Sequence, residues 1–243
     1  MWNLFNKKST KSIYEFLKSD MHSHLLPSVD DGVQDLETSI NYIKDFYELG
    51  YRKLVLSPHI YAEFYPNNKA DLLARFEVLK ASVAANNIPI VLELAAEYFM
   101  DAHFETLLQN NELLAFGDNY LLVETSFVGL PLNFEDMLFE IVTMGYQPIL
   151  AHPERYIYLA RNMSYFRKLH ERNVHLQVNL LSLFGYYGHA SNDIVKYLLN
   201  EKLVSFIGTD LHNEKHLNLL KKYAFDNSTL KLLEKQPLLN ATL

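Results

Sequence analysis

Residues 20–32 read DMHSHLLPSVDDG. His22 and His24 are separated by one residue, so on an extended segment their side chains point to the same side. A proline and a glycine predict a loop after this segment, and the loop would bring Asp30 and Asp31 back near the two imidazoles. Imidazole nitrogens beside carboxylate oxygens are preferred ligands of divalent metals such as Mn²⁺, Zn²⁺ or Fe²⁺. A polar strand end followed by a solvated turn would explain the stretch equally well. The residues at the other strand ends must therefore distinguish a metal site from a solvated turn.

Short apolar runs alternate with helical periodicity along the chain. Besides the segment near residue 20, strands are expected at residues 53–57, 88–96, 120–123, 147–151, 175–179 and 203–208. Helices are expected at residues 36–49, 69–86, 134–144, around 165–170, at 191–200 and in the C-terminal segment, with a break near Pro237. Strands that alternate with helices predict a parallel sheet, here closed into a seven-stranded barrel in a single domain.

Composition excludes several classes of protein. The chain of 243 residues has a formal net charge of −7, which argues against nucleic acid as a main partner because a phosphate backbone requires a basic face. It has no cysteine, which excludes disulfides, thiolate metal sites and cysteine nucleophiles. No apolar run is long enough to cross a bilayer and no signal-peptide pattern is present, so we expect a cytoplasmic protein.

Residues 1–18 form a lead segment with four lysines, Lys7, Lys8, Lys11 and Lys18. We expect a tail or a short helix folded against the bottom of the barrel. A basic patch that docks on a membrane or an acidic partner is the alternative, but four lysines are too few to favour it. The main domain is therefore expected at residues 19–243.

Six of the seven expected strands end in side chains that can bind a metal. These residues are His22, His24, His59, Glu97, Glu124, His152, Asp210 and His212. The remaining strand ends at Gln177 and Asn179, which are also polar. Because the carboxyl ends of parallel barrel strands converge on one face, these residues are expected to meet in one cavity. A lone histidine or glutamate is more often an ordinary polar residue, but that does not explain the recurrence at nearly every strand end.

Together with Asp31, these side chains supply five histidines and four carboxylates, more than one metal ion needs. Two or three divalent ions are the economical explanation. Clustered cations neutralise developing negative charge and lower the pKa of a bound water, and phosphate ester hydrolysis needs both effects. Arg155 lies three residues after His152, and its planar fork of donors matches phosphate oxygens; a surface salt bridge is its alternative role. The other five histidines are expected to be ordinary: His103, His170, His175, His189 and His216.

Seven motifs together resemble the polymerase and histidinol phosphatase (PHP) superfamily, and within it the bacterial capsular-polysaccharide type of protein tyrosine phosphatase. They are HSHLLPSVDDG at 22–32, SPH at 57–59, AEYF at 96–99, ETS at 124–126, AHPERY at 151–156, NLLSLFGYYG at 179–188 and GTDLH at 208–212. The resemblance extends from Asp20 to about Asn213. It implies the PHP fold, a distorted seven-stranded (β/α)7 TIM-like barrel, which agrees with the strand count.

The resemblance implies a manganese-dependent enzyme that hydrolyses phosphotyrosine with a metal-bridging hydroxide and opposes a tyrosine kinase of capsular or exopolysaccharide export. It implies two to three divalent metal ions, with Fe, Zn or Mg as alternatives to Mn²⁺. The implied ligands are His22, His24, Asp31, His59, Glu97, Glu124, His152, Asp210 and His212. Arg155 would bind the phosphate and stabilise the transition state, and Asp31, or a water beside His212, would protonate the leaving group. Ser28 stands where the family usually has glycine, so that turn is expected to differ slightly.

Other functions remain open. A histidinol-phosphate phosphatase, or another small-molecule phosphoesterase of the superfamily, uses the same metal chemistry, although the LPSVDDG and HPERY runs favour the tyrosine phosphatase. A PHP nuclease conflicts with the acidic charge, and a non-catalytic kinase-binding module would not need the full ligand set. Six aromatic residues fall in loops after strands, where most are expected to pack and some to grip a phosphotyrosine ring: Tyr61, Tyr65, Phe99, Phe127, Tyr156 and Tyr158.

Overall fold

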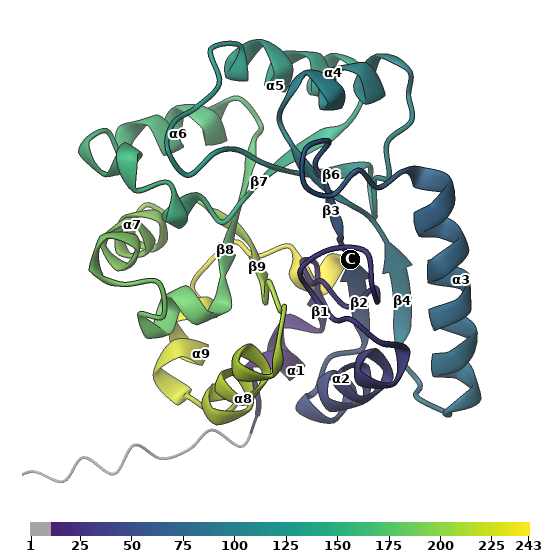
Figure 1. The fold of residues 1–243 in the computed structure, drawn as a ribbon. Coiled ribbons are helices and arrows are strands. Elements are labelled where there is room, and N and C mark those ends of the chain that lie inside the picture. Colours follow the sequence, from purple (N-terminus) through teal and green to yellow (C-terminus); the bar gives the residue numbers. More distant parts are fainter. Residues whose placement is uncertain (1–10) are drawn as a thin grey trace, which may run out of the picture.

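Nine strands form two parallel sheets in the computed structural model, which describes residues 11–243 (Figure 1). The smaller sheet has the order β1 (Ser19–Asp20), β2 (Lys53–Leu56) and β4 (Val91–Leu94). The larger has the order β3 (His59–Ile60), β5 (Glu97–Phe99), β6 (Tyr120–Glu124), β7 (Gln147–Ala151), β8 (His175–Asn179) and β9 (Val204–Gly208). Neighbouring strands are parallel throughout both sheets. The predicted α/β class with parallel strands is confirmed.

The predicted seven-stranded closed barrel is wrong in its strand count and in its closure. The predicted strand at 53–57 ends at Pro58, which has no N–H to donate to a ladder, and the chain resumes as β3. Of the neighbouring predicted strand at 88–96, only Val91–Leu94 forms β4, and a separate strand, β5, begins beyond it at Glu97. Beyond β1, Ser23 pairs with Leu211 through an isolated parallel bridge, where a closed barrel would have a continuous ladder.

Helices follow the strands and surround them on the outside (Figure 1). They are α1 (Ile13–Leu17), α2 (Leu36–Leu49), α3 (Lys69–Ala85), α4 (Ala102–Gln109), α5 (Phe134–Thr143), α6 (Ser164–Glu171), α7 (His189–Asn200), α8 (Glu214–Tyr223) and α9 (Asn227–Leu233). Short 3₁₀ helices occur at η1 (Pro153–Arg155), η2 (Ile157–Arg161), η3 (Leu180–Phe184) and η4 (Asn240–Thr242). Asp or Asn side chains accept a hydrogen bond from the first turn of five helices, α2, α3, α4, α8 and α9, which fixes where each begins. None of the described helices combines the length and apolarity needed to cross a membrane.

Apolar side chains pack on both faces of the strands, because successive side chains of a strand point to opposite sides. A smaller buried cluster collects Val55 from β2, Leu122 from β6, Ile149 from β7 and Phe206 from β9. Both sheets contribute to it, so it fills the space between them. A larger buried cluster lies between the strands and the helices. The strand ends are thereby held on a rigid apolar base.

The lead segment is described from residue 11 onward, and the predicted tail with its first two lysines, in residues 1–10, lies outside the described residues. α1 buries Ile13, Tyr14 and Leu17. The Tyr14 hydroxyl donates to the carbonyl of Leu220 at 2.7 Å. The described part of the segment is therefore a short helix that packs on the C-terminal helices.

Candidate metal centre

The strands bring all nine predicted ligands together. In the parallel ladders His59 lies opposite Glu97, and Phe99 lies opposite Glu124. The ligands form three overlapping groups, and within each group the ligand atoms lie within 4.8 Å of one another. The groups are His24, Asp31, His59 and His212; His22, His24 and Asp210; and His59, Glu97 and Glu124. The ninth residue, His152, joins through its Nε2, 3.0 Å from Oε1 of Glu97. The predicted convergence of strand ends is thus observed.

Glu97 is fully buried and contacts four histidines. Its Oε2 lies 3.0 Å from Nε2 of His22, 3.3 Å from Nε2 of His24 and 3.2 Å from Nδ1 of His59. Its Oε1 faces His152. A carboxylate whose two oxygens face different imidazoles would be able to hold a metal ion together with them.

His22 and His24 direct their Nε2 atoms at each other, 3.2 Å apart. Each Nδ1 has its own acceptor, Oε1 of Gln177 for His22 and Oδ2 of Asp30 for His24, both at 2.8 Å. A proton on Nδ1 leaves a lone pair on Nε2. Oδ1 of Asp210 lies 3.4 Å from both Nε2 atoms. Electron-rich atoms at this spacing repel one another unless a cation lies among them, so the residues fit a divalent metal.

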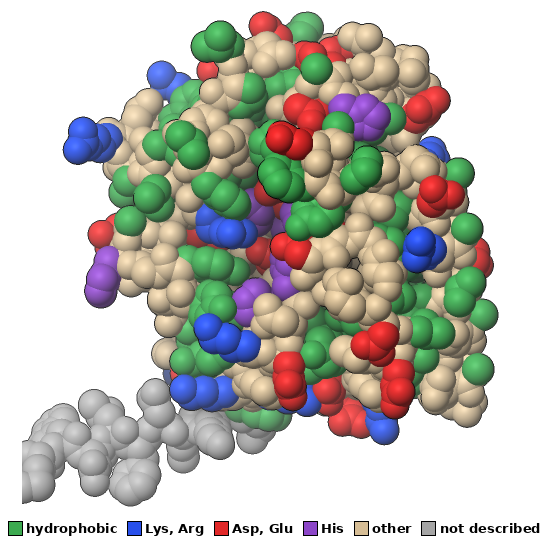
Figure 2. All heavy atoms as spheres, viewed as in Figure 1, with side chains coloured by type: hydrophobic (Ala, Val, Ile, Leu, Met, Phe, Trp, Pro, Cys, Tyr) green, Lys and Arg blue, Asp and Glu red, His purple; other side chains and the backbone are tan. Residues whose placement is uncertain are grey.

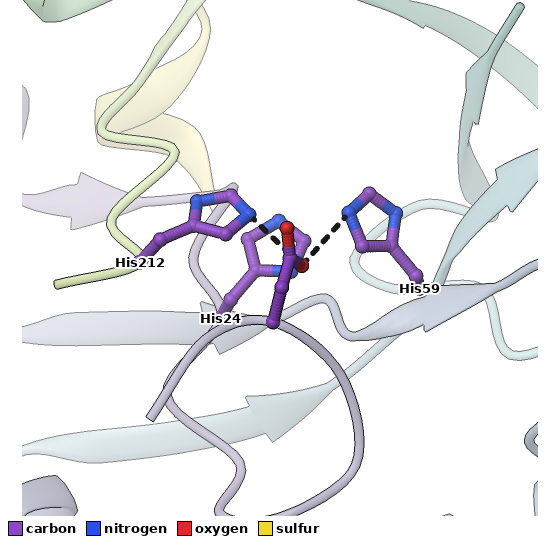
Figure 3. Close-up of side chains that lie close together, drawn as sticks. His24, His59 and His212 are labelled. Carbon is purple, nitrogen blue, oxygen red and sulfur yellow. Dashed lines mark ion pairs between the residues drawn. The ribbon is translucent and has the colours of Figure 1, made fainter. Parts of the chain in front are cut away.

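A second group joins Asp31 to His24, His59 and His212. Figure 3 shows these three histidines and marks two of the ion pairs of the group with dashed lines. Oδ1 of Asp31 lies 3.6 Å from Nε2 of His59 and 3.5 Å from Nε2 of His212. The rings of His24 and His212 stack with their centroids 3.9 Å apart. The Asp31 side chain is 55% exposed, whereas that of Glu97 is 0% exposed. The site therefore has an inner group around Glu97 and an outer one around Asp31.

Several site residues adopt the left-handed backbone conformation that favours glycine. Asp210 has a φ of 51°, His152 of 34° and Ser28 of 59°, and such strain collects at functional sites. Ser28 adopts this conformation in the turn that precedes Asp30, and the expected slight difference of this turn from the resembled family stays a prediction. At Gly32 a Cβ atom would collide with the backbone oxygen of His24.

Opposite charges determine the ionisation of the site. Burial alone would lower the pKa of His22, but Glu97 and Asp210 outweigh it and raise that pKa to about 9. Burial acts to raise the pKa of both carboxyl groups, yet the imidazoles hold the pKa of Glu97 and of Asp210 well below the usual range. For Asp31, burial is outweighed by the contact with His212, and the pKa falls to about 2. In the absence of a metal, protonated imidazole rings balance the negative charges of these carboxylates.

Metal uptake by the metal-free protein is expected to release protons. Because the pKa of His22 is raised from 6.5 to about 9, this ring carries a proton at neutral pH that a metal must displace. The apparent affinity of the protein for the metal should therefore increase as the pH rises from 6.5 to 9. Calorimetric titration with Mn²⁺ in two buffers of different ionisation enthalpy counts the protons. Equal heats in both buffers would contradict this protonation state.

A cavity of about 650 Å³ opens beside the ligands. Figure 2 shows it as a hollow in which histidine and acidic side chains are visible, with basic and hydrophobic side chains along its edge. Aromatic residues make up much of the wall: Tyr61, Phe64, Tyr65, Phe99, Phe127, Tyr186 and Tyr187. Four of the six aromatic residues considered for the mouth are among them. Of the other two, Tyr156 is fully buried and Tyr158 donates to the carbonyl of Ser126.

Arg155 lies in the cavity wall between two aromatic rings. The carbon of its guanidinium is 4.3 Å from the ring centroid of Phe127 and 5.0 Å from that of Tyr187. Burial would lower its pKa, but Asp210, 3.4 Å away, outweighs burial and raises it. The neighbouring Glu154 is fully buried and bonds elsewhere, so the carboxylate that Arg155 contacts is Asp210 and not Glu154.

Four further residues support the site and were not assigned from the sequence. Their contacts are Asp30 with His24 at 2.8 Å, Gln177 with His22 at 2.8 Å, Asn179 with Asp210 at 2.6 Å, and His216 with the carbonyl of Asp210 at 3.3 Å. His216 also lines the cavity, although it was expected to be ordinary. Two sequence signals pointed toward them: the loop that was expected to bring Asp30 near the imidazoles, and the polar end of the strand that carries Gln177 and Asn179.

Comparison with known protein sequences gives two findings. The family model described as capsular polysaccharide synthesis, CpsB/CapC, matches residues 18–222. The tyrosine-protein phosphatase YwqE of Bacillus subtilis (strain 168) is 29% identical over 218 residues, which cover 89% of this chain and 84% of that protein.

Solved structures give two further findings. A chain from the crystal structures of YwqE from Bacillus subtilis and CpsB from Streptococcus pneumoniae, described as unique metal-dependent tyrosine phosphatases, superposes with a TM-score of 0.78. It is 27% identical and covers 89% of this chain and 86% of that chain. The phosphotriesterase homology protein from Escherichia coli shares the fold, with a TM-score of 0.52 and 14% identity. The superposition covers 89% of this chain and 91% of that chain.

Proposed function

The chain belongs to the capsular polysaccharide synthesis CpsB/CapC family, and from that membership we propose that it is a metal-dependent protein tyrosine phosphatase. The observation that carries the proposal is the cluster of nine imidazole and carboxylate ligands beside an aromatic-lined cavity that also holds Arg155. We assign the phosphatase domain to residues 19–243 and the lead segment to residues 1–18.

The proposed metal ligands are His22, His24, Asp31, His59, Glu97, Glu124, His152, Asp210 and His212. Three overlapping groups of ligand atoms support two or three divalent ions. A donor set of nitrogen and oxygen suits Mn²⁺, with Fe²⁺, Zn²⁺ or Mg²⁺ as alternatives. When bound, such ions would lower the pKa of a water molecule and neutralise charge on phosphate oxygens.

Arg155 is the proposed phosphate-binding residue. The flanking rings of Phe127 and Tyr187 restrict its guanidinium, which remains accessible from the cavity. Its planar fork matches two phosphate oxygens and stabilises the charge that develops on them in the transition state. The neighbouring rings of Tyr61 and Phe99, stacked 4.0 Å apart, supply apolar surface for the phenyl ring of phosphotyrosine.

The leaving group needs little help from an acid. Asp31, with a pKa near 2, is ionised at neutral pH and has no proton to donate. A water beside His212 is therefore the favoured proton source. Tyrosine has a pKa of about 10 and departs far more readily than a serine alkoxide, which supports phosphotyrosine as the substrate.

We propose a protein as the bearer of that phosphotyrosine, and specifically a bacterial tyrosine kinase of polysaccharide export. The cavity opens on the surface as a hollow (Figure 2), so a side chain carried on a polypeptide can enter it. The family description places its members in capsular polysaccharide synthesis, which is the process such a kinase would serve.

The substrate class is testable with two phosphate esters. With Mn²⁺ present, we expect a phosphotyrosine peptide to exceed histidinol phosphate in kcat/KM by roughly 10²-fold or more, because the apolar phenyl ring packs better on the aromatic wall than the smaller, polar imidazole of histidinol. Phosphate release is measured for both, and removal of metal by a chelator is the control. Preference for histidinol phosphate would favour a small-molecule phosphoesterase. Inactivity on both would favour a non-catalytic kinase-binding module.

A further inference from the structure

A chain of buried amides joins two of the proposed ligands. Oε1 of Gln177 accepts the Nδ1 proton of His22 at 2.8 Å. Nε2 of Gln177 donates to Oδ1 of Asn179 at 2.8 Å, and Nδ2 of Asn179 donates to Oδ2 of Asp210 at 2.6 Å. Both amide side chains are fully buried. No solvent competes for these bonds. A third contact also holds each amide, because Gln177 accepts from the backbone of His152 and Asn179 donates to the Tyr187 hydroxyl, both at 3.3 Å.

The direction of this chain is fixed independently at its two ends. An ionised carboxylate accepts only, so Asn179 must turn its NH₂ group toward Asp210 and its oxygen toward Gln177. At the other end, the backbone N–H of His152 donates to Oε1 of Gln177 at 3.3 Å, which makes that oxygen an acceptor. Both constraints demand the same orientation of Gln177. His22 must then keep a proton on Nδ1, so the proton that a metal ion would displace is the one on Nε2.

Gly208 leaves the space that this arrangement needs. A Cβ atom at Gly208 would lie 2.7 Å from Cβ of His22 and 2.8 Å from Nε2 of Gln177. Gly208 pairs with Asn179 across β8 and β9, where a register irregularity falls between Leu176 and Gln177. The backbone of β9 is thus fitted closely to the amide of Gln177.

We propose that Gln177 and Asn179 form an amide relay, a pair of positioning residues that sets the tautomer of His22 and the rotation of Asp210 for one metal ion. His22 and Asp210 belong to the same group of ligand atoms, which supports a shared ion. Ligands already oriented in the folded protein bind a metal more tightly, since no ordering remains for the binding step. The inference rests on the proposed metal centre.

Two single variants test the relay by metal affinity. Gln177→Leu removes the bonds of Gln177 to His22, to Asn179 and to the backbone of His152 at similar volume, and Asn179→Ala releases Asp210. Each is expected to weaken Mn²⁺ binding by about 10–100-fold, measured as free Mn²⁺ by electron paramagnetic resonance. Because the two amides act in series, the double variant should bind Mn²⁺ only slightly more weakly than the single variant with the lower Mn²⁺ affinity. If Gln177→Leu does not fold, Asn179→Ala carries the test.

Asn240 supplies a matched control. It is a buried amide outside the site whose Nδ2 donates to the carbonyls of Ser19 at 3.0 Å and Ile207 at 2.7 Å. Asn240→Ala should lower the melting temperature yet bind Mn²⁺ as the wild type does. A relay variant that melts lower but keeps wild-type Mn²⁺ affinity would have a merely structural role, which overturns the proposal.

A spectroscopic readout follows the tautomer directly. In the Zn²⁺-loaded wild type, long-range proton–nitrogen spectra should show His22 protonated on Nδ1, with slow exchange of that proton. In Gln177→Leu the exchange should become fast. A slow Nδ1 proton in the variant, or additive affinity losses in the double variant, would refute the relay. A wild type that binds neither metal would instead contradict the proposed metal centre.

Discussion

Replacing Glu97 by glutamine is expected to remove the bound metal and to lower phosphatase activity by about 10³-fold or more. The substitution keeps the volume of the side chain but removes the negative charge shared by four imidazoles, two of which are 3.0 Å from its oxygens. The amide nitrogen would also direct protons at one of those rings. Metal content by elemental analysis and kcat on a phosphotyrosine peptide measure the two effects.

Glu154→Gln is the matched control for this prediction. Glu154 is also fully buried, but burial raises its pKa, and its Oε1 accepts from the backbone of Asn179 and from Ser182. A glutamine oxygen can accept both bonds, so metal content should be unchanged. Wild-type metal content in Glu97→Gln would contradict the proposed role of Glu97 as a metal ligand.

Arg155→Ala is expected to lower kcat/KM by roughly 10²–10³-fold while metal content stays close to that of the wild type. Arg155 lies 3.4 Å from Asp210, and Asp210 keeps its contacts with His22, His24 and Asn179 when the guanidinium is removed. Steady-state kinetics and elemental analysis on the same preparation test both parts.

Arg155→Lys separates charge from geometry. Lysine keeps the positive charge but lacks the planar fork and stacks less well between Phe127 and Tyr187. Its kcat/KM should lie between those of the wild type and the alanine variant. Loss of metal in Arg155→Ala would show instead that this residue supports the metal centre.

The positions of the ligands could be predicted because parallel strands bring their carboxyl ends together. β7 and β8 have the predicted bounds, and the side chains that follow β7 and β9, His152 and Asp210, lie in the cluster as expected. Strand division was harder to predict. Pro58 marks the break after β2, but the corresponding break between β4 and β5 depends on pairing that one sequence does not reveal. α4 was not predicted, because a helix of eight residues is too short to show a clear helical period in the sequence.

The supporting contacts could not be predicted, because they depend on register and rotamer. Gln177 reaches His22 across 155 positions of sequence, beside a register irregularity in β8. His216 reaches Asp210 from α8, and the rings that enclose Arg155 come from two separate loops. A polar residue at a strand end indicates a site, but its bonding partner emerges only with the packing.

The most direct test of the proposed metal-dependent phosphatase is an anomalous diffraction map of crystals grown with Mn²⁺ and phosphate. We expect two or three manganese peaks within the groups formed by His22, His24 and Asp210, by His59, Glu97 and Glu124, and by His24, Asp31, His59 and His212. Phosphate should lie between these peaks and Arg155. A map with no manganese among these residues, or with phosphate bound away from Arg155, would contradict the account.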